Sequence, residues 1–257
     1  MRIAVVSDIH GNLPALEAVV HDLGRRGVDR VVNLGDNLSG PLLVRETARY
    51  LMAQDWVHLA GNHERQLLAL DLATPDIARL QPSDAYARAQ LGAAELAWLA
   101  TLPPTMRLSP EVLLCHGTPS SDITYFLETL APDQMRLASD VEITERMGDT
   151  AAELILCGHT HIPRAVRAAN GTLIVNPGSV GLQAYDDDRP YFHMIENGSP
   201  DARYAIVERI DGAWTSTLIA VPYDARPMAA LALRNGRPEW AHALLTGYGR
   251  QQDRATV

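Results

Sequence analysis

Cysteine is scarce in this sequence, which has only Cys115 and Cys157 among its 257 residues. Two isolated cysteines are too few for a disulfide framework, and their positions do not match a zinc motif. We interpret both as small buried residues of strands with reduced thiols. The composition also lacks the signature of disorder, because 47% of the residues are hydrophobic and 21% are charged.

Long hydrophobic runs are missing as well. The short apolar stretch at the N-terminus meets Asp8 and His10 at once, whereas a signal peptide needs a longer stretch and a cleavage site. No window approaches the roughly 20 apolar residues of a membrane-spanning helix. We therefore expect a soluble, cytoplasmic protein that does not act on a membrane.

Positive charge is in deficit. The chain has 22 Lys+Arg against 31 Asp+Glu, a formal net charge of −9. This balance argues against binding of a long nucleic acid, and therefore against a nuclease that acts on polymers. It does not exclude a small phosphate-bearing substrate, because a bound metal ion can reverse the local field.

The first 60 residues alternate between strand and helix patterns. Short apolar runs predict strands, and apolar residues at helical spacing predict helices. The expected strands are 2–7, 28–34 and 56–60, and the expected helices are 13–26 and 42–54. A β-α-β-α-β order is typical of an α/β fold with parallel strands.

The rest of the chain changes character. Residues 63–102 read as mostly helical, and a helix is expected over 133–148 between strands at 112–115 and 153–157. Four strands in hairpins and two helices follow, at 173–176, 191–195, 204–210, 214–221, 227–234 and 238–245. We expect one domain over 1–257, with 204–250 as a strand-and-helix extension and frayed residues after it. The two last helices pack in the core, cover the active site or form a homo-oligomer interface.

Potential ligands follow five of the predicted strands. They are Asp8 and His10, Asp36, Asn62 and His63, His116, and His159 with His161. In open α/β sheets, sites form beyond the carboxyl ends of strands. A single Asp or His at such a place is usually a turn former or a helix cap. Five strand ends that each carry a potential ligand instead indicate a metal site.

The chemistry of this set favours divalent transition metals. Carboxylate, imidazole and amide groups without thiolates suit Mn, Fe, Zn or Ni rather than a structural zinc site. The donors exceed the needs of one tetrahedral ion, but they match two ions about 3.5–4 Å apart that share a carboxylate.

The same residues carry a family resemblance. The motifs "DIHGN", "GDNLSG", "GNHE", "CHG" and "GHTH" resemble, in this order, those of the calcineurin-like metallophosphoesterase superfamily, and "NPGSVG" resembles a segment of small prokaryotic members. The resemblance covers roughly residues 1–185. It implies an α/β (α+β) fold, a four-layer sandwich of two mixed β-sheets flanked by helices.

The resemblance also implies roles for these residues. One metal would be held by Asp8, His10, Asp36 and His161, and the other by Asp36, Asn62, His116 and His159, with Asp36 bridging. The implied reaction is phosphate-ester hydrolysis by a hydroxide that bridges two divalent ions, of which manganese is expected and Fe, Zn or Ni are alternatives. His63 would assist the leaving group, or alternatively form hydrogen bonds behind the ligands.

One departure separates the chain from the Ser/Thr protein phosphatase branch. That branch has an acidic residue that orients the catalytic histidine and an arginine that binds phosphate, where this sequence has Ser39 and Gly40. The chain therefore looks more like small phosphodiesterases or dinucleoside-polyphosphate hydrolases. Other candidate phosphate-binding arginines are Arg45, Arg65, Arg164 and Arg189, and Asp186–Asp188 either form a solvated loop or line the entrance.

We expect a metal-dependent phosphodiesterase or phosphatase acting on a small phosphate ester. Asn12 and Asn37 stand beside predicted ligands, where they either contact substrate or stabilise their own turns. The alternatives are a protein phosphatase and a binding or scaffold protein that uses the same fold with little or no catalysis.

Overall fold

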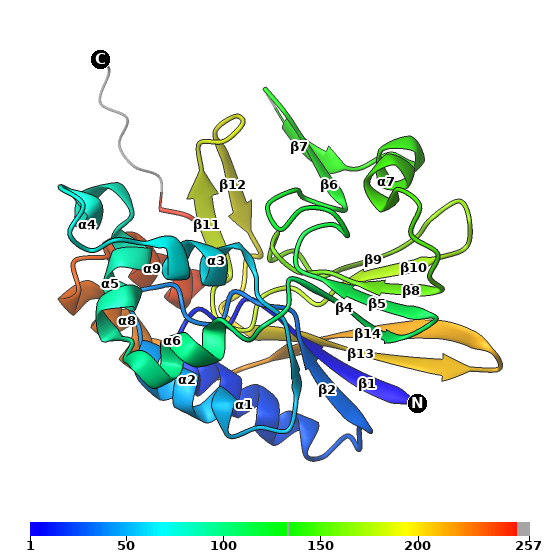
Figure 1. The fold of residues 1–257 in the computed structure, drawn as a ribbon, viewed down its shortest axis with the longest axis horizontal. Helices are drawn as coiled ribbons and strands as arrows, with labels where there is room; N and C mark the ends of the chain where they lie inside the picture. Colours follow the sequence, from blue (N-terminus) through cyan, green and yellow to red (C-terminus); the bar gives the residue numbers. More distant parts are fainter. Residues whose placement is uncertain (133, 251–257) are drawn as a thin grey trace.

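Two five-stranded β-sheets form the centre of the protein (Figure 1). The computed structural model describes residues 1–132 and 134–250. The first sheet has the order β14-β13-β1-β2-β3, and the second has the order β4-β5-β8-β10-β9. Strands of the first sheet are β1 (Arg2–Val6), β2 (Arg30–Asn33), β3 (Val57–His58), β13 (Ala202–Ile210) and β14 (Ala213–Val221). Strands of the second are β4 (Thr105–Ser109), β5 (Val112–Cys115), β8 (Leu154–Leu156), β9 (Arg164–Arg167) and β10 (Leu173–Asn176).

Both sheets are mixed. In the first sheet β1, β2 and β3 run parallel, whereas β13 pairs antiparallel with both β1 and β14. In the second sheet β5, β8 and β10 run parallel, with β4 and β9 antiparallel at the edges. The parallel strands of each sheet therefore end at the same edge, where the loops that carry the predicted ligands begin.

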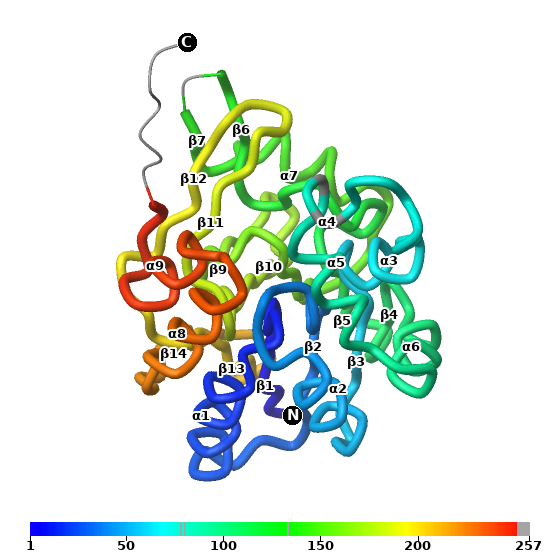
Figure 2. The backbone as a smooth tube through the Cα atoms, turned by 90° about the vertical axis from the view of Figure 1, so that its left-hand side faces the viewer, coloured from blue at the N-terminus to red at the C-terminus, as the bar shows by residue number. Residues whose placement is uncertain are grey.

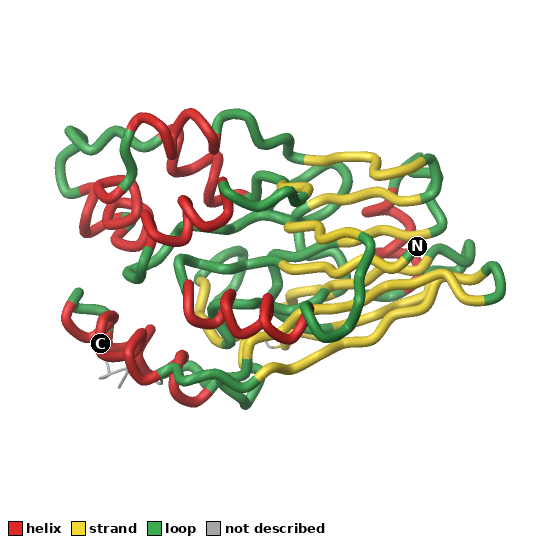
Figure 3. The backbone as a smooth tube through the Cα atoms, turned by 90° about the horizontal axis from the view of Figure 1, so that it is seen from below, coloured by secondary structure: helices red, strands yellow, loops and turns green. Residues whose placement is uncertain are grey.

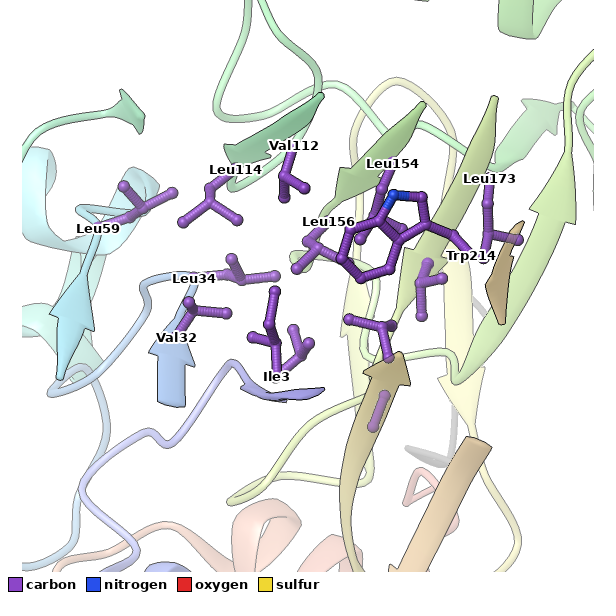
Figure 4. Close-up of a cluster of buried hydrophobic side chains, with 14 residues drawn as sticks. Ile3, Val32, Leu34, Leu59, Val112, Leu114, Leu154, Leu156, Leu173 and Trp214 are labelled. Carbon is purple, nitrogen blue, oxygen red and sulfur yellow. The ribbon is translucent and has the colours of Figure 1, made fainter. Parts of the chain in front are cut away.

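The main hydrophobic core lies between the two sheets (Figure 4). Ile3 and Leu34 face it from the first sheet side, and Leu114 and Leu156 face it from the second, all fully buried. The indole of Trp214 on β14 closes this core at one side. Burial of these side chains, each worth about 1.5–3 kcal/mol, fixes the two sheets against each other.

Helices cover the outer face of each sheet. Helix α1 (Leu13–Leu23) packs Leu16 and Val19 onto the first sheet, and α7 (Asp140–Met147) packs Ile143 and Met147 onto the second. The result is a helix–sheet–sheet–helix arrangement, so the predicted four-layer sandwich of mixed sheets is confirmed.

The remaining elements surround the carboxyl ends of the parallel strands. In Figure 3 the strands gather at one end of the molecule and most helices at the other. These helices include α2 (Val44–Met52), α3 (Asn62–Ala69), α4 (Ile77–Leu80), α5 (Pro82–Gln90), α6 (Ala93–Leu99), α8 (Arg226–Arg234) and α9 (Pro238–Thr246). Two hairpins project beyond the sheets, β6 (Glu128–Ala131) with β7 (Gln134–Leu137), and β11 (Ala184–Asp187) with β12 (His193–Glu196) (Figure 1).

The predicted helix over 133–148 is wrong in its first part. Residue 133 lies outside the described residues, residues 134–137 form β7, and the helix begins only at Asp140. Ser139 caps that helix, because its side chain accepts a hydrogen bond from the backbone N–H of Glu142. The strands β4, β6, β9 and β11 were not predicted, and the expected fraying after residue 250 falls on residues that the structure does not describe. Within the described ranges, no helix has the length and hydrophobicity needed to span a membrane.

Candidate metal centre and active-site cleft

The predicted ligands lie on loops with an unusual backbone conformation. Among the described non-glycine residues, seven have a positive φ, and five of these are predicted metal ligands. The five are Asp8, His10, Asp36, His159 and His161, with φ between 52° and 69°. Left-handed backbone is unfavourable for residues with a side chain and is retained mainly where the surroundings require it, often at functional sites.

Hydrogen bonds fix the orientation of four imidazoles. The Nδ1 atoms of three of them contact backbone carbonyls at 2.7–2.9 Å, so the Nε2 lone pair of each ring is left to face the site. These contacts join His10 to Ser39, His116 to Leu34 and His161 to Leu182. The ring of His159 is turned the other way, because its Nε2 lies 3.1 Å from the carbonyl of Ile123 and the lone pair of its Nδ1 is the one left to bind a metal.

The ligand atoms form two groups. Asp8, His10 and His161 offer atoms within 4.8 Å of one another, and Asp36, His116 and His159 form the second such group. The groups adjoin, because Nε2 of His116 lies 3.0 Å from Oδ2 of Asp36 and 3.9 Å from Oδ1 of Asp8. Two imidazole-and-carboxylate groups in contact match a site for two divalent cations.

The contacts inside these groups call for a cation. The Nε2 atoms of His10 and His161 lie 3.2 Å apart although both Nδ1 atoms are already engaged with carbonyls. Oδ1 of Asp8 and Oδ1 of Asn62 are buried without a hydrogen-bond partner among the described residues. Buried polar atoms without partners are costly, and a bound metal ion would satisfy them. The residues present therefore fit a pair of divalent metals.

Electrostatics point the same way. Burial opposes the charged form of His116, but the nearby charge of Asp36 raises its pKa to about 10. Burial, together with the neighbouring His161, lowers the pKa of His10 to about 4. The two groups thus mix carboxylates with imidazoles whose proton affinities are far apart, as is common at functional sites.

Glu64 ties two of the ligand loops together. Its buried carboxylate accepts hydrogen bonds of 2.8 Å from the backbone N–H groups of Asp36, Asn37 and Gly61. Gly61 is required at this crossing, since a Cβ there would overlap the carboxylate of Asp36. The carboxylate of Asp36 also accepts a bond of 2.9 Å from the backbone N–H of His63, which sets its orientation.

His63 lies beside the two groups and not within either. Its Nδ1 is 2.9 Å from Oδ1 of Asp84, which also accepts a bond of 2.7 Å from the hydroxyl of Ser39. Burial disfavours the charged imidazole, but the charge of Asp36 and the bond to Asp84 raise the pKa of His63 to about 9. These contacts favour the protonated form of His63, whose imidazole is oriented at the edge of the site by Asp84 on α5.

Asp84 was missed in the sequence. The protein phosphatase branch has an acidic residue at the position of Ser39, and here Ser39 instead bonds to an acid supplied from 45 residues further along the chain. The only local signal is the helix start "PSD" at 82–84, which gives no indication of what the side chain contacts.

A cleft of about 330 Å³ opens over the site. His10, Asp36, Asn62, His63, His159 and His161 line its floor, and β11 and α9 supply much of its wall. Asp186 and Asp187 line it as exposed residues of β11, in agreement with the entrance interpretation of that run. In Figure 2, α9 lies beside the β11–β12 hairpin. The volume is that of a small-molecule site.

The four candidate arginines are not among the residues that line this cleft. Arg45 donates to the carbonyl of Gln90, Arg65 pairs with Asp122 and Arg164 pairs with Glu128. Arg189 follows the exposed run of acidic residues in the β11–β12 hairpin. Among the described residues, the basic side chains that line the cleft are Arg237 and Arg250, which the sequence did not single out.

Asn12 and Asn37 are fully buried and stand apart from the residues that line the cleft. The amide of Asn12 donates to the carbonyl of Gly181 and to the hydroxyl of Tyr223, and its oxygen caps α1. The side-chain oxygen of Asn37 accepts a hydrogen bond from Asn33. These contacts correspond to the structural alternative for both residues.

Two tyrosines support the His159 loop. The hydroxyl groups of Tyr125 and Tyr185 lie 2.7 Å apart, and that of Tyr125 is also 2.9 Å from Nε2 of His193. Tyr185 donates to the carbonyl of His159 at 3.4 Å, and its ring meets that of His161 edge-on. Both tyrosines line the cleft, but no local sequence signal connects them to it.

A four-layer sandwich with two adjoining Asp/His groups at its strand ends is the arrangement expected of a metal-dependent hydrolase. The sequence pattern of the calcineurin-like phosphoesterase superfamily domain matches residues 1–197. The chain therefore belongs to this superfamily and is a metal-dependent phosphoesterase. The resemblance identified in the sequence is confirmed.

Relatives match nearly the whole chain. The uncharacterized protein MJ0912 of Methanocaldococcus jannaschii is 26% identical over 247 residues, which cover 93% of this chain and 94% of that protein. A metallophosphoesterase from Sphaerobacter thermophilus superposes with a TM-score of 0.74 at 27% identity, covering 96% of this chain and 100% of the other. The hypothetical protein PH1004 of Pyrococcus horikoshii shares the fold, with a TM-score of 0.71 at 19% identity and coverage of 97% and 99%.

Proposed function

We propose that this protein hydrolyses a small phosphate ester, as a phosphodiesterase or phosphatase with two divalent metals. The observation that carries the proposal is the pair of adjoining ligand groups, with His63 and Asp84 at their edge. One metal is assigned to Asp8, His10, Asp36 and His161, and the second to Asp36, Asn62, His116 and His159. The nitrogen and oxygen donors suit Mn, Fe, Zn and Ni alike, and manganese is the one of these that we propose.

The protein's own groups have separate tasks in this reaction. Bound divalent ions supply Lewis-acid chemistry, which activates water and neutralises charge on the phosphoryl oxygens. His63, protonated and directed by Asp84, donates its proton to the departing oxygen. The cleft holds the ester, and its 330 Å³ suits a compact substrate rather than a polymer.

A metal and substrate panel tests the proposal. Protein stripped with a chelator is expected to lose hydrolysis of bis(p-nitrophenyl) phosphate, and Mn²⁺ is expected to restore it, with about two ions bound per chain by elemental analysis. The panel adds an aryl monoester, a cyclic nucleotide, a dinucleoside polyphosphate and a phosphopeptide. Full activity after chelation would contradict the metal mechanism. Substoichiometric metal together with no turnover on any ester would favour the scaffold alternative.

Asp84 is expected to act as a positioning residue. Asp84→Asn should lower kcat by roughly 10- to 100-fold with little change in KM and in bound metal, because His63 loses its charged partner but the ligands remain. Steady-state kinetics and elemental analysis measure these effects. Asp84→Glu should recover part of the rate, and the exposed Asp55→Asn should behave as wild type. A rise in KM with kcat unchanged would mean that Asp84 serves binding instead.

A further inference from the structure

Arg237 places a guanidinium in the wall of the cleft. The chain contains no lysine, and all 22 of its basic residues are arginines. Most of the arginines lie away from the cleft, but Arg237 lines it with only 18% of its side chain exposed. Residue 237 lies beyond the segment 1–197 that matches the superfamily pattern.

This guanidinium is held in one orientation. Its Nη1 donates to the hydroxyl of Ser83 at 2.8 Å, and its Nε donates to the carboxylate of Glu239. Its central carbon lies 5.9 Å from the ring centroid of Trp240, within cation–π range. Nη2 makes no hydrogen bond to the described residues. A planar guanidinium fixed in this way is prepared to bind an anionic oxygen.

The neighbours of Arg237 place it on the His63 side of the cleft. Ser83, which holds Arg237, is adjacent in sequence to Asp84, which holds His63. The first turn of α5 therefore anchors both the group assigned to the leaving oxygen and the guanidinium. An anion bound by Arg237 would belong to the leaving-group part of a substrate.

The surrounding carboxylates limit how much negative charge this place accepts. Glu239 is paired with Arg237, and Asp186 and Asp187 stand exposed along the same cleft. A long polyanion would be repelled, whereas one additional anionic group beside Arg237 would not.

We propose that Arg237 forms a subsite for a second anionic group, best matched by a phosphoryl group, on the leaving-group side of the substrate. The inference rests on the proposed function and names a substrate class for it. A diphosphate-linked ester would place one phosphorus at the metals and the other at Arg237. Hydrolysis would then add water across the P–O–P bridge between them, and the departing phosphate, which is stable as an anion, would leave beside Arg237 with a hydrogen bond from His63.

Two substrates with the same bases, one with and one without a second phosphoryl group, distinguish a loss of this subsite from an overall loss of activity. Diadenosine diphosphate carries a second phosphoryl group, and adenylyl-(3′→5′)-adenosine carries a single one. Arg237→Gln is expected to lower kcat/KM for the diphosphate by roughly 10-fold or more, mainly through KM, and for the monophosphate-linked dinucleoside several-fold less. Arg234→Gln, at an exposed arginine of α8, is the matched control and should leave both unchanged.

Glu239→Gln is expected to change KM in the opposite direction to Arg237→Gln. Removing this carboxylate frees Arg237 from its charged partner, so KM for the diphosphate should fall. If Arg237 only supported the fold of α9, Arg237→Gln and Glu239→Gln would both impair the two substrates alike, and that result would overturn the proposal.

Binding gives a readout that does not need turnover. Calorimetric titration of the Mn²⁺-loaded protein with α,β-methylene-ADP should show about 10-fold weaker binding for Arg237→Gln and tighter binding for Glu239→Gln, with smaller changes for AMP. Equal changes for both ligands would contradict the subsite. A wild-type protein that hydrolyses neither the two dinucleosides nor bis(p-nitrophenyl) phosphate but shows this binding pattern would refute the proposed hydrolysis and leave the subsite standing.

Discussion

Asp36→Asn is expected to lower the rate of phosphodiester hydrolysis by roughly 1000-fold or more and to reduce bound metal from two ions to one or fewer. Asp36 contacts His116 at 3.0 Å and is the carboxylate assigned to both metals. An amide keeps the shape but removes the negative charge that offsets two cations. Hydrolysis of bis(p-nitrophenyl) phosphate in Mn²⁺ and elemental analysis of the same sample measure the two losses.

The control for this variant is Asp76→Asn. Asp76 has nearly the same φ as Asp36, 59° against 55°, but it is an exposed residue that is not among those lining the cleft. Its substitution should leave rate and metal content unchanged. If Asp36→Asn retained full activity with metal present, the bridging assignment would be wrong. Thermal unfolding of both variants separates loss of metal from loss of fold.

His63→Ala is expected to slow hydrolysis of esters with poor leaving groups by roughly 100- to 10,000-fold, since an alkoxide needs a proton as it departs. An ester of p-nitrophenol should be affected much less, because its leaving group is stable without a proton. Metal content should stay the same, because His63 belongs to neither ligand group. The measurement is kcat over a series of diesters whose leaving groups differ in pKa.

The exposed His21→Ala should show no change across the same series. A uniform loss for His63→Ala, independent of the leaving group, would assign His63 to hydrogen bonding behind the ligands and not to proton donation. A parallel loss of metal would point to the same conclusion.

The sequence was sufficient to predict that the proposed ligands lie together, because each one lies within a few residues after the end of a strand. Parallel strands must end at a common edge, so the order of Asp8, Asp36, Asn62, His116 and His159 along the chain already implied that they meet. The layered fold was also predictable. Apolar strands that alternate with amphipathic helices can bury the sheet faces and the apolar helix faces in only a few arrangements.

The residues that the sequence missed act over long distances. Asp84 reaches His63 and Ser39 from a helix of ordinary composition, and the cleft position of Arg237 depends on how α9 packs. No spacing within a single element encodes such contacts. The roles of these side chains become visible only once the elements are placed in space.

The error over 133–148 has a related cause. Residues such as Gln134 and Arg136 have good helix propensity, but propensity is a weak preference that tertiary contacts override. Here Arg146 of α7 donates to the carbonyls of Phe126 and Glu128, which ties the start of the β6–β7 hairpin to the helix as a separate element. The helix then begins at the Ser139 cap.

The cleft is built from two segments that lie far apart in the sequence, one with the proposed metal ligands and one in the α8–α9 region. The proposed metal ligands end at His161, while the cleft residues of this region begin at Arg237, so laboratory evolution can diversify one without rewriting the other. Replacement of the α8–α9 region is limited by one contact. The indole of Trp240 meets the ring of His10 edge-on at 5.9 Å and occupies the space beside Gly40. A transplanted or randomised wall must therefore keep an aromatic wedge at this position, or it will disturb the reaction centre whose range it was meant to broaden.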